Sequence, residues 1–196
     1  MSRTLHVIMV AFHRVIPLRI MIDCFLVQDC PDWKLHIIHD GPAPQEVRDV
    51  INLYHDPRID YIETPAVNGS WGHPNRGMGL KKLSLNHRDY VLLTNDDNYY
   101  VPFFVRKMLT RANGVAGMVY CDTVHSYSGY DILRTELREN HIDMGSFIVR
   151  VDIAKRVGFT DTHFSADGAY AVKCSEYSMK RRMPCFHLAS PLFIHN

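Results

Sequence analysis

The sequence is short of cysteine, has no excess of either charge, and contains no long hydrophobic run. Its five cysteines among 196 residues form no Cys-x-x-Cys pair, which argues against a disulfide framework and favours a reducing compartment. Lys and Arg together number 22, and Asp and Glu 21, whereas a dedicated nucleic-acid binder usually carries a basic excess. No stretch approaches the roughly 18 apolar residues of a membrane-spanning helix. We therefore expect a cytoplasmic protein that binds no nucleic acid and has no transmembrane segment.

Motifs of several enzyme classes are missing as well. The chain contains no HExxH or HxH sequence and no zinc-type spacing of Cys and His, so no common zinc site is indicated. It has no GxSxG, no P-loop, and no GxGxxG after its first apolar run. These absences remove the commonest alternatives among α/β folds. Histidine, by contrast, is plentiful at 12 residues, most of them in positions that fit a solvated or structural role.

Short apolar runs alternate with helical stripes along the first third of the chain. Strands are predicted over 5–12, 35–38 and 58–63, and helices over about 17–26 and 47–54. This alternation is typical of a mainly parallel sheet covered by helices. No linker, repeat or low-complexity tract divides the chain, so we expect a single α/β domain over 1–196. Further strands are predicted over 90–94, 115–121, 145–149 and 186–195, and further helices after Pro102, over 151–157 and over about 169–182.

The loops that follow the predicted strands are the first candidates for a site, because ligands bind such sheets at the carboxyl ends of the strands. The loop after the first strand contains His13 and Arg14, and the loop after the second contains Asp40. Asp40 could accept a hydrogen bond from a nucleobase or a ribose hydroxyl. Because it opens an Asp-Gly pair, it could equally form a plain turn.

The segment 68–79 is polar and rich in glycine. Its glycines argue against a helix. We interpret it either as a flexible surface loop or as a loop whose backbone approaches a ligand, with His73 and Arg76 as polar contacts. A helix is expected to begin within 81–86.

Two adjacent carboxylates, Asp96 and Asp97, lie just beyond the predicted strand 90–94. Neighbouring carboxylates repel each other and lose solvation when buried, unless positive charge lies beside them. A divalent cation is a natural partner, and oxygen ligands without a thiolate favour Mg²⁺ or Mn²⁺ over zinc. His195, which follows the last apolar run, could complete the metal shell. Alternatively, the acidic pair caps the helix expected after Pro102.

Asp167 lies just before the last predicted helix. It could cap that helix. It could also act as a general base that takes a proton from a hydroxyl group.

Taken in order, five segments resemble the GT-A glycosyltransferases, especially the large inverting family 2. The resemblance covers about residues 5–183 and implies a GT-A (nucleotide-diphospho-sugar transferase, Rossmann-like) domain, whose mainly parallel mixed sheet is flanked by helices. It also implies a nucleotide-binding half at about 1–98 and an acceptor-side half at about 99–196. The segments are the strand 7–12, Asp40-Gly41, Asn68 with 75–77, the strand and acidic sequence 91–97, and 143–147 continued by 157–159 and 166–167.

The resemblance implies transfer of a sugar from a nucleotide-sugar donor, most commonly a UDP-sugar, to an acceptor hydroxyl with inversion. The acceptor would be a glycan, a protein or a lipid-linked molecule, and the oligomeric state stays open. Asp97 and His195 would hold Mn²⁺ or Mg²⁺, and Asp167 would be the catalytic base. The residues expected to bind the donor are Ala11, His13, Arg14, Asp40, Asn68, Arg76, Asn95, Asp96, Asp143 and Gly145.

The sequence also departs from the family's pattern. Asn95 stands where the first acid of the DxD motif is expected, and Ala166 replaces the Glu before Asp167. The segment 68–79 is longer than usual, and the chain is short for the family. These departures keep open a non-catalytic module that binds a sugar or a sugar nucleotide. A sugar-nucleotide pyrophosphorylase fits less well, because 11–14 is not the glycine-rich, Arg-containing loop that it would need there.

Overall fold

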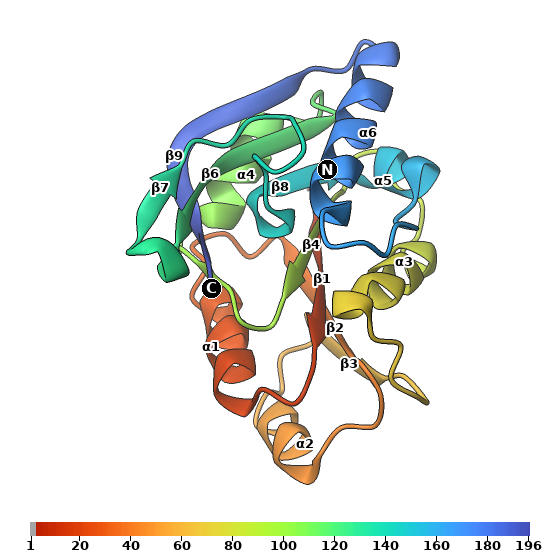
Figure 1. Cartoon of the computed structure of the whole chain (residues 1–196), viewed down its shortest axis with the longest axis vertical. Coiled ribbons are helices and arrows are strands. Elements are labelled where there is room, and N and C mark those ends of the chain that lie inside the picture. Colours follow the sequence, from red (N-terminus) through yellow and green to blue (C-terminus); the bar gives the residue numbers. More distant parts are fainter. Residues whose placement is uncertain (1–2) are drawn as a thin grey trace.

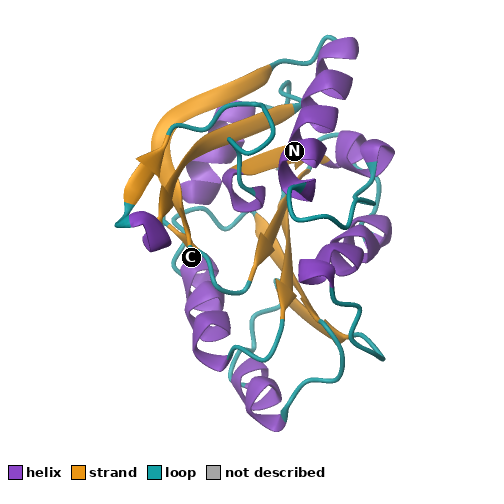
Figure 2. Ribbon diagram, viewed as in Figure 1, coloured by secondary structure: helices purple, strands orange, loops and turns teal. Residues whose placement is uncertain are grey.

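A computed structural model describes residues 3–196, which form one sheet with helices on both sides (Figures 1 and 2). The helices are α1 (Val15–Leu26), α2 (Gln45–Asn52), α3 (His73–Lys82), α4 (Phe104–Ala112), α5 (Val151–Val157) and α6 (Ala166–Lys180). The strands are β1 (Leu5–Ala11), β2 (Trp33–His39), β3 (Ile59–Glu63), β4 (Tyr90–Asn95), β5 (Tyr99–Tyr100), β6 (Met118–His125), β7 (Asp131–Leu133), β8 (Phe147–Arg150) and β9 (Cys185–His195).

The sheet has a parallel half and a mixed half. Its strand order is β3-β2-β1-β4-β8-β6-β9-β5, with β7 paired to β6. The first four strands are mutually parallel. Strand β8 is antiparallel to both β4 and β6, and β9 runs parallel to β6. It follows that β1, β2, β3, β4, β6 and β9 all point the same way and end at one edge of the sheet, while β8 begins at that edge.

Two hydrophobic cores lie on opposite faces of the sheet. Alternate residues of β1 face opposite sides, because successive side chains of a strand do so: Val7 and Met9 join the first core, and Ile8 joins the second. Helices α1, α2 and α4 cover the first core, and α3, α5 and α6 cover the second. The expected α/β class, with helices flanking a mainly parallel sheet, is confirmed.

Helix α3 corrects the prediction for 68–79. The segment is not a loop throughout, since residues from His73 onward form a buried helix. Its glycines serve close packing: a Cβ on Gly79 would lie 2.8 Å from Ile8 Cγ2, and one on Gly77 would lie 2.6 Å from the Phe159 carbonyl oxygen. The helix ends at Lys82, so the helix predicted to begin within 81–86 is wrong.

Two element boundaries differ from prediction in ways that place site residues. Strand β6 continues past 121 to His125, because its extension pairs with β9, across two shifts of register at Asp122. Helix α6 begins at Ala166 rather than near 169, which puts Asp167 in its first turn. Within 3–196, none of the helices has the length and apolar character needed to cross a bilayer.

Candidate functional site

Two cavities lie at the edge where the parallel strands end. The β1 cavity has a volume of about 670 Å³, and the β6 cavity about 570 Å³. Trp71 and Asn95 line both cavities. The predicted residues at the β1 cavity are Ala11, His13, Arg14, Asp40, Asn95 and Asp97. Those at the β6 cavity are Arg76, Asn95, Asp143, Gly145, Asp167 and His195. The structure thus gathers the predicted residues at one edge, apart from Asn68 and Asp96, which line neither cavity.

The acidic pair already has a positive partner within the chain. Arg14 Nη2 lies 2.5 Å from Asp96 Oδ1, and Arg14 Nη1 pairs with Asp97 Oδ2. Asp96 is fully buried and accepts a hydrogen bond from the Phe12 backbone N–H at 3.1 Å. Burial raises the pKa of Asp96 to about 6, although Arg14 opposes the shift. The buried Oδ1 of each carboxylate has no hydrogen-bond partner among the described residues, although Asp96 Oδ1 forms the ion pair with Arg14.

Asp40 holds the turn that leads into α3. Its carboxylate accepts hydrogen bonds from the backbone N–H groups of Asn68 at 2.8 Å and Gly69 at 3.0 Å. It also accepts one from Asn75 Nδ2 at 2.9 Å, and Asn68 Nδ2 donates to Asn75 Oδ1 at 2.7 Å. Asp40 and Asn68 therefore shape the wall of the β1 cavity, where Trp71 adopts a left-handed backbone with φ of 52°.

Arg76 is a buried cation whose hydrogen-bond partners in the described chain are all neutral. It is 2% exposed. Its Nη1 donates to the Trp71 carbonyl oxygen at 2.8 Å and to His73 Nδ1 at 2.9 Å, and its Nη2 donates to Asn95 Oδ1. Burial and the charge of Arg76 lower the pKa of His73 to about 4, which keeps its ring neutral and able to accept.

The positive charge of Arg76 could be balanced by a bound anion. Burial lowers its pKa to about 10, and the charges of Asp167 and Asp97 only partly offset that shift. Its buried Nε has no hydrogen-bond partner among residues 3–196. A buried charge without an ionic partner is costly. The lining of the β6 cavity therefore contains a cation that an anionic ligand would stabilise.

Asp167 is a carboxylate with raised basicity. It projects from the first turn of α6 into the β6 cavity, and its Oδ1 accepts a hydrogen bond from the Gly168 backbone N–H at 2.8 Å. Burial raises the pKa of Asp167, and the charge of Asp143 adds to the rise, while the Gly168 N–H and Arg76 oppose it. A carboxylate whose pKa is raised is a stronger base once ionised.

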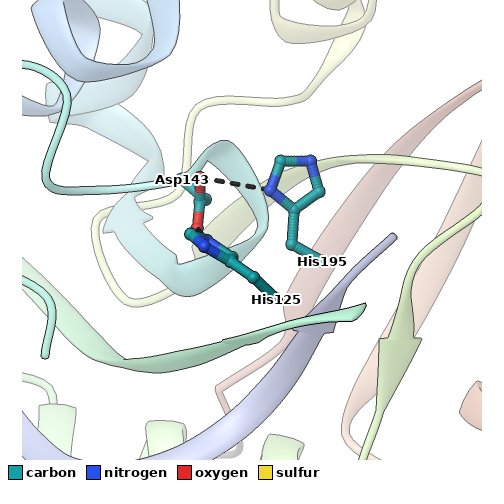
Figure 3. Close-up of side chains that lie close together, drawn as sticks. All are labelled: His125, Asp143 and His195. Carbon is teal, nitrogen blue, oxygen red and sulfur yellow. Dashed lines mark hydrogen bonds and ion pairs between the residues drawn. The ribbon is translucent and has the colours of Figure 1, made fainter. Parts of the chain in front are cut away.

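Asp143 lies between two histidines at the same edge, and Figure 3 shows both rings beside its carboxylate. His125 Nε2 is 2.8 Å from Asp143 Oδ2, and His195 Nδ1 is 3.2 Å from Asp143 Oδ1. Burial opposes ionisation of Asp143, but His195 and His125 outweigh it and lower the pKa. Conversely, burial would lower the pKa of His195, but Asp143 raises it overall.

Sequence comparison decides the family. The model of "Glycosyl transferase family 2" matches residues 6–184 of this chain. The chain belongs to glycosyl transferase family 2. Comparison with curated protein sequences gives no significant match.

Solved structures share the fold of this family 2 chain. S. aureus TarS 1–349 superposes with a TM-score of 0.77 at 11% identity, over 98% of this chain and 60% of that one. The same fragment in complex with UDP-GlcNAc gives 0.76 at 13% identity, over 98% and 58%. The mannosyltransferase PcManGT from Pyrobaculum calidifontis, in complex with GDP-Man and Mn²⁺, gives 0.71 at 17%, over 99% and 57%. The predicted GT-A fold is confirmed, and the chain spans about 60% of the length of these relatives' chains.

Three residues of the candidate site were not predicted. Phe12 is 44% exposed, lines the β1 cavity and stacks on His13 with ring centroids 4.2 Å apart. Phe164 is 80% exposed at the β6 cavity and lies edge-on to Trp71 at 5.8 Å. His125 ends β6, four residues beyond the end of the predicted strand 115–121. Phe12 carries a signal in the sequence, since it immediately follows the first buried strand, whereas Phe164 carries none.

Proposed function

We propose that this chain transfers a sugar from a nucleoside diphosphate sugar, with UDP as the first candidate nucleotide, to an acceptor hydroxyl with inversion. The observation that carries the proposal is Arg76, a buried guanidinium with neutral partners at the lining of the β6 cavity. A diphosphate leaving group would supply the missing negative charge, because guanidinium groups bind phosphate oxygens well. The UDP, UDP-GlcNAc and GDP-Man complexes of structural relatives support this class of donor.

The nucleoside of the donor is assigned to the β1 cavity and the acceptor to the β6 cavity. The diphosphate is assigned to the boundary between them, where Arg76 contacts Trp71 and Asn95, which line both cavities. Phe12 and His13 offer stacked rings for a nucleobase at the β1 cavity, since aromatic faces bind bases by stacking. Asp40 and Asn68 keep the wall in place, and Asp96 holds Arg14. This assignment makes about 1–98 the donor half and about 99–196 the acceptor half.

Asp97 and His195 fit a role in holding a divalent cation, Mn²⁺ or Mg²⁺. The buried Oδ1 of Asp97 has no hydrogen-bond partner among the described residues, and the charge of Asp97 acts on His195. Ions of this kind take one or two protein carboxylates and complete their shell with water and phosphate oxygens. When bound, the ion would neutralise charge on the diphosphate.

Asp167 and Arg76 then have different roles in the transfer. Asp167 accepts the proton of the acceptor hydroxyl, and the acceptor oxygen forms a bond to the anomeric carbon. The bond from that carbon to the diphosphate oxygen breaks on the opposite face, so the configuration inverts without a carboxylate nucleophile. Arg76 stabilises the departing diphosphate. The exposed rings of Trp71 and Phe164 at the rim suit a glycan acceptor.

The test compares Asp167→Asn with Asp161→Asn. Asp161 precedes the same helix but pairs with Lys173 at 2.7 Å, an exposed ion pair of little energetic weight. With a panel of UDP- and GDP-sugars and oligosaccharide acceptors, Asp167→Asn should keep nucleotide affinity and lose about 10²–10⁴-fold in transfer rate. Asp161→Asn should behave as wild type. Retained transfer in Asp167→Asn would exclude Asp167 as the base.

The second candidate is a non-catalytic module that binds sugar nucleotides. Asn95 and Ala166 replace two acidic residues of the family pattern, and both substitutions lower the count of catalytic carboxylates. Calorimetric binding of UDP-sugars by the wild type, with neither transfer nor hydrolysis across the same panel, would favour the module over the enzyme.

A further inference from the structure

His39 is a fully buried histidine at the end of β2. It lines neither cavity, but it contacts the loop that lines the β1 cavity. Its Nε2 lies 3.3 Å from the His13 backbone nitrogen, and its Nδ1 lies 2.8 Å from the Gly41 carbonyl oxygen. Both ring nitrogens are therefore paired with backbone groups, one in the loop after β1 and one in the loop after β2.

The two contacts determine which ring nitrogen of His39 carries the hydrogen. The His13 backbone N–H can only donate, so Nε2 of His39 must accept with its lone pair. The Gly41 carbonyl oxygen can only accept, so Nδ1 must carry the hydrogen and donate it. The neutral ring with hydrogen on Nδ1 is the form that makes both hydrogen bonds. The ring of His39 thus connects the two loops.

The Gly41 end of this connection is held firmly by its surroundings. Gly41 has a φ of 85°, a left-handed conformation that favours glycine. Its N–H donates to Thr64 Oγ1 at 2.6 Å. A Cβ at this position would lie 2.7 Å from Val67 Cγ2. His39 therefore ties the loop after β1 to a turn that has little room to move.

The His13 end of the connection is a backbone conformation that needs support. His13 has a φ of 51°, which is uncommon for a residue other than glycine and costs free energy. The hydrogen bond from its N–H to His39 offsets part of that cost. The His13 ring also stacks on His39 and on Phe12, with centroids 5.3 and 4.2 Å apart. His39 thus supports both the backbone and the ring of His13, and through them Phe12.

We propose that His39 is a positioning residue for the nucleobase, which holds His13 and Phe12 in the arrangement on which the base of the donor stacks. The inference rests on the proposed function, because that function assigns the base to these two rings. Rings that are already in place spare the ligand the entropic cost of ordering them. None of the hydrogen bonds of Arg76 involves these three residues. His39 should therefore affect binding of the nucleoside and not of the diphosphate.

Two amide substitutions separate the two hydrogen bonds. In His39→Asn the amide can donate to the Gly41 carbonyl oxygen from the position of Nδ1, but it is too short to reach the His13 N–H. In His39→Gln the amide oxygen can reach the position of Nε2 and accept from His13. Calorimetry with UDP and Mn²⁺ should show about 10-fold weaker binding for His39→Asn and a loss of no more than about 2-fold for His39→Gln. Inorganic pyrophosphate with Mn²⁺ should bind both variants like the wild type.

The ligand-free protein provides a second measurement. Amide hydrogen exchange at His13, followed by NMR, should be about 10-fold faster in His39→Asn than in the wild type and close to wild type in His39→Gln. His36→Asn is the matched control, because His36 lies on the same strand and pairs with Asp60 at 3.1 Å. It should leave UDP affinity and the exchange at His13 unchanged. If His39→Asn does not fold, His39→Phe keeps a ring, removes both hydrogen bonds and should show the same losses.

The possible outcomes distinguish this inference from the proposed function. Wild-type UDP affinity in His39→Asn, or an equal loss in His39→Asn and His39→Gln, would overturn the positioning role. An equal loss of UDP and pyrophosphate affinity would show a general structural role for His39 and would also overturn it. A wild-type protein that binds neither UDP nor pyrophosphate would instead refute the donor site of the proposed function.

Discussion

Replacing Arg76 by Met removes the buried charge while keeping a long side chain of similar reach. Burial lowers the pKa of Arg76 from 12.5 to about 10. Each pKa unit corresponds to about 1.36 kcal/mol, so holding the charge inside the folded protein costs about 3 kcal/mol at neutral pH. The sign is unambiguous: a base whose pKa falls on folding destabilises the fold wherever it is protonated. The bound diphosphate would offset this cost.

The variant should therefore separate stability from binding. It loses the hydrogen bonds to the Trp71 carbonyl, His73 Nδ1 and Asn95 Oδ1, each worth about 1 kcal/mol. The net change in the free energy of unfolding, measured by urea denaturation, should therefore be within about 1 kcal/mol of zero. Affinity for UDP with Mn²⁺, measured by calorimetry, should fall by about 10- to 100-fold, because a charge-assisted contact is lost.

Arg150→Met is the matched control. Arg150 donates to Asp152 at 2.6 and 2.7 Å and does not line either cavity. Its replacement should lower stability and leave UDP affinity unchanged. If Arg76→Met instead lost more than about 2 kcal/mol of stability and bound UDP like the wild type, Arg76 would be a structural residue and the anion site would be refuted.

Three further changes test other parts of the structure. Hydrogen bonds from Arg150 and His87 outweigh the effect of burial and lower the pKa of Asp152 from 3.8 to about 2. Roughly 2 kcal/mol of stability should therefore be lost as pH falls from about 4 to 2. Asp152→Asn should remove this dependence of the free energy of unfolding on pH. A Cβ on Gly145 would lie 2.5 Å from Phe193 Cε2, so Gly145→Ala should cost about 1–3 kcal/mol and lower the melting temperature. Asp40→Asn should loosen the turn that begins at 68, lower the free energy of unfolding by about 1.5–3 kcal/mol and speed proteolytic cleavage of that turn. If the turn stayed uncleaved and uridine bound more weakly, Asp40 would instead be a residue that contacts the nucleobase.

Elements set by local pattern could be predicted from the sequence. The helix over 151–157 has the predicted bounds, and β1 and β4 lie within a residue of theirs. Short apolar runs and helical stripes are local signals, because one face of each element must be buried. The clustering of site residues at one edge followed from a rule of topology, namely that parallel strands end together.

Features that depend on distant partners could not be predicted in this way. The glycines within 68–79 argue against a helix, yet α3 forms there and a Cβ on Gly79 would contact Ile8 and Ile38. Likewise, His125 and His195 become neighbours only through the register of β6 with β9. Neither contact can be inferred from the residues that neighbour it in the sequence. Packing and register, rather than propensity, determine these parts of the site.

The pairing of Arg14 with Asp96 and Asp97 alters the case for a metal. The sequence suggested a divalent cation because adjacent buried carboxylates need a positive neighbour. In the folded chain Arg14 provides it, so these carboxylates alone do not require an ion. The diphosphate of a bound donor would bring further negative charge to an edge that already holds Asp97. Any ion held by Asp97 should therefore bind more tightly with nucleotide than without it.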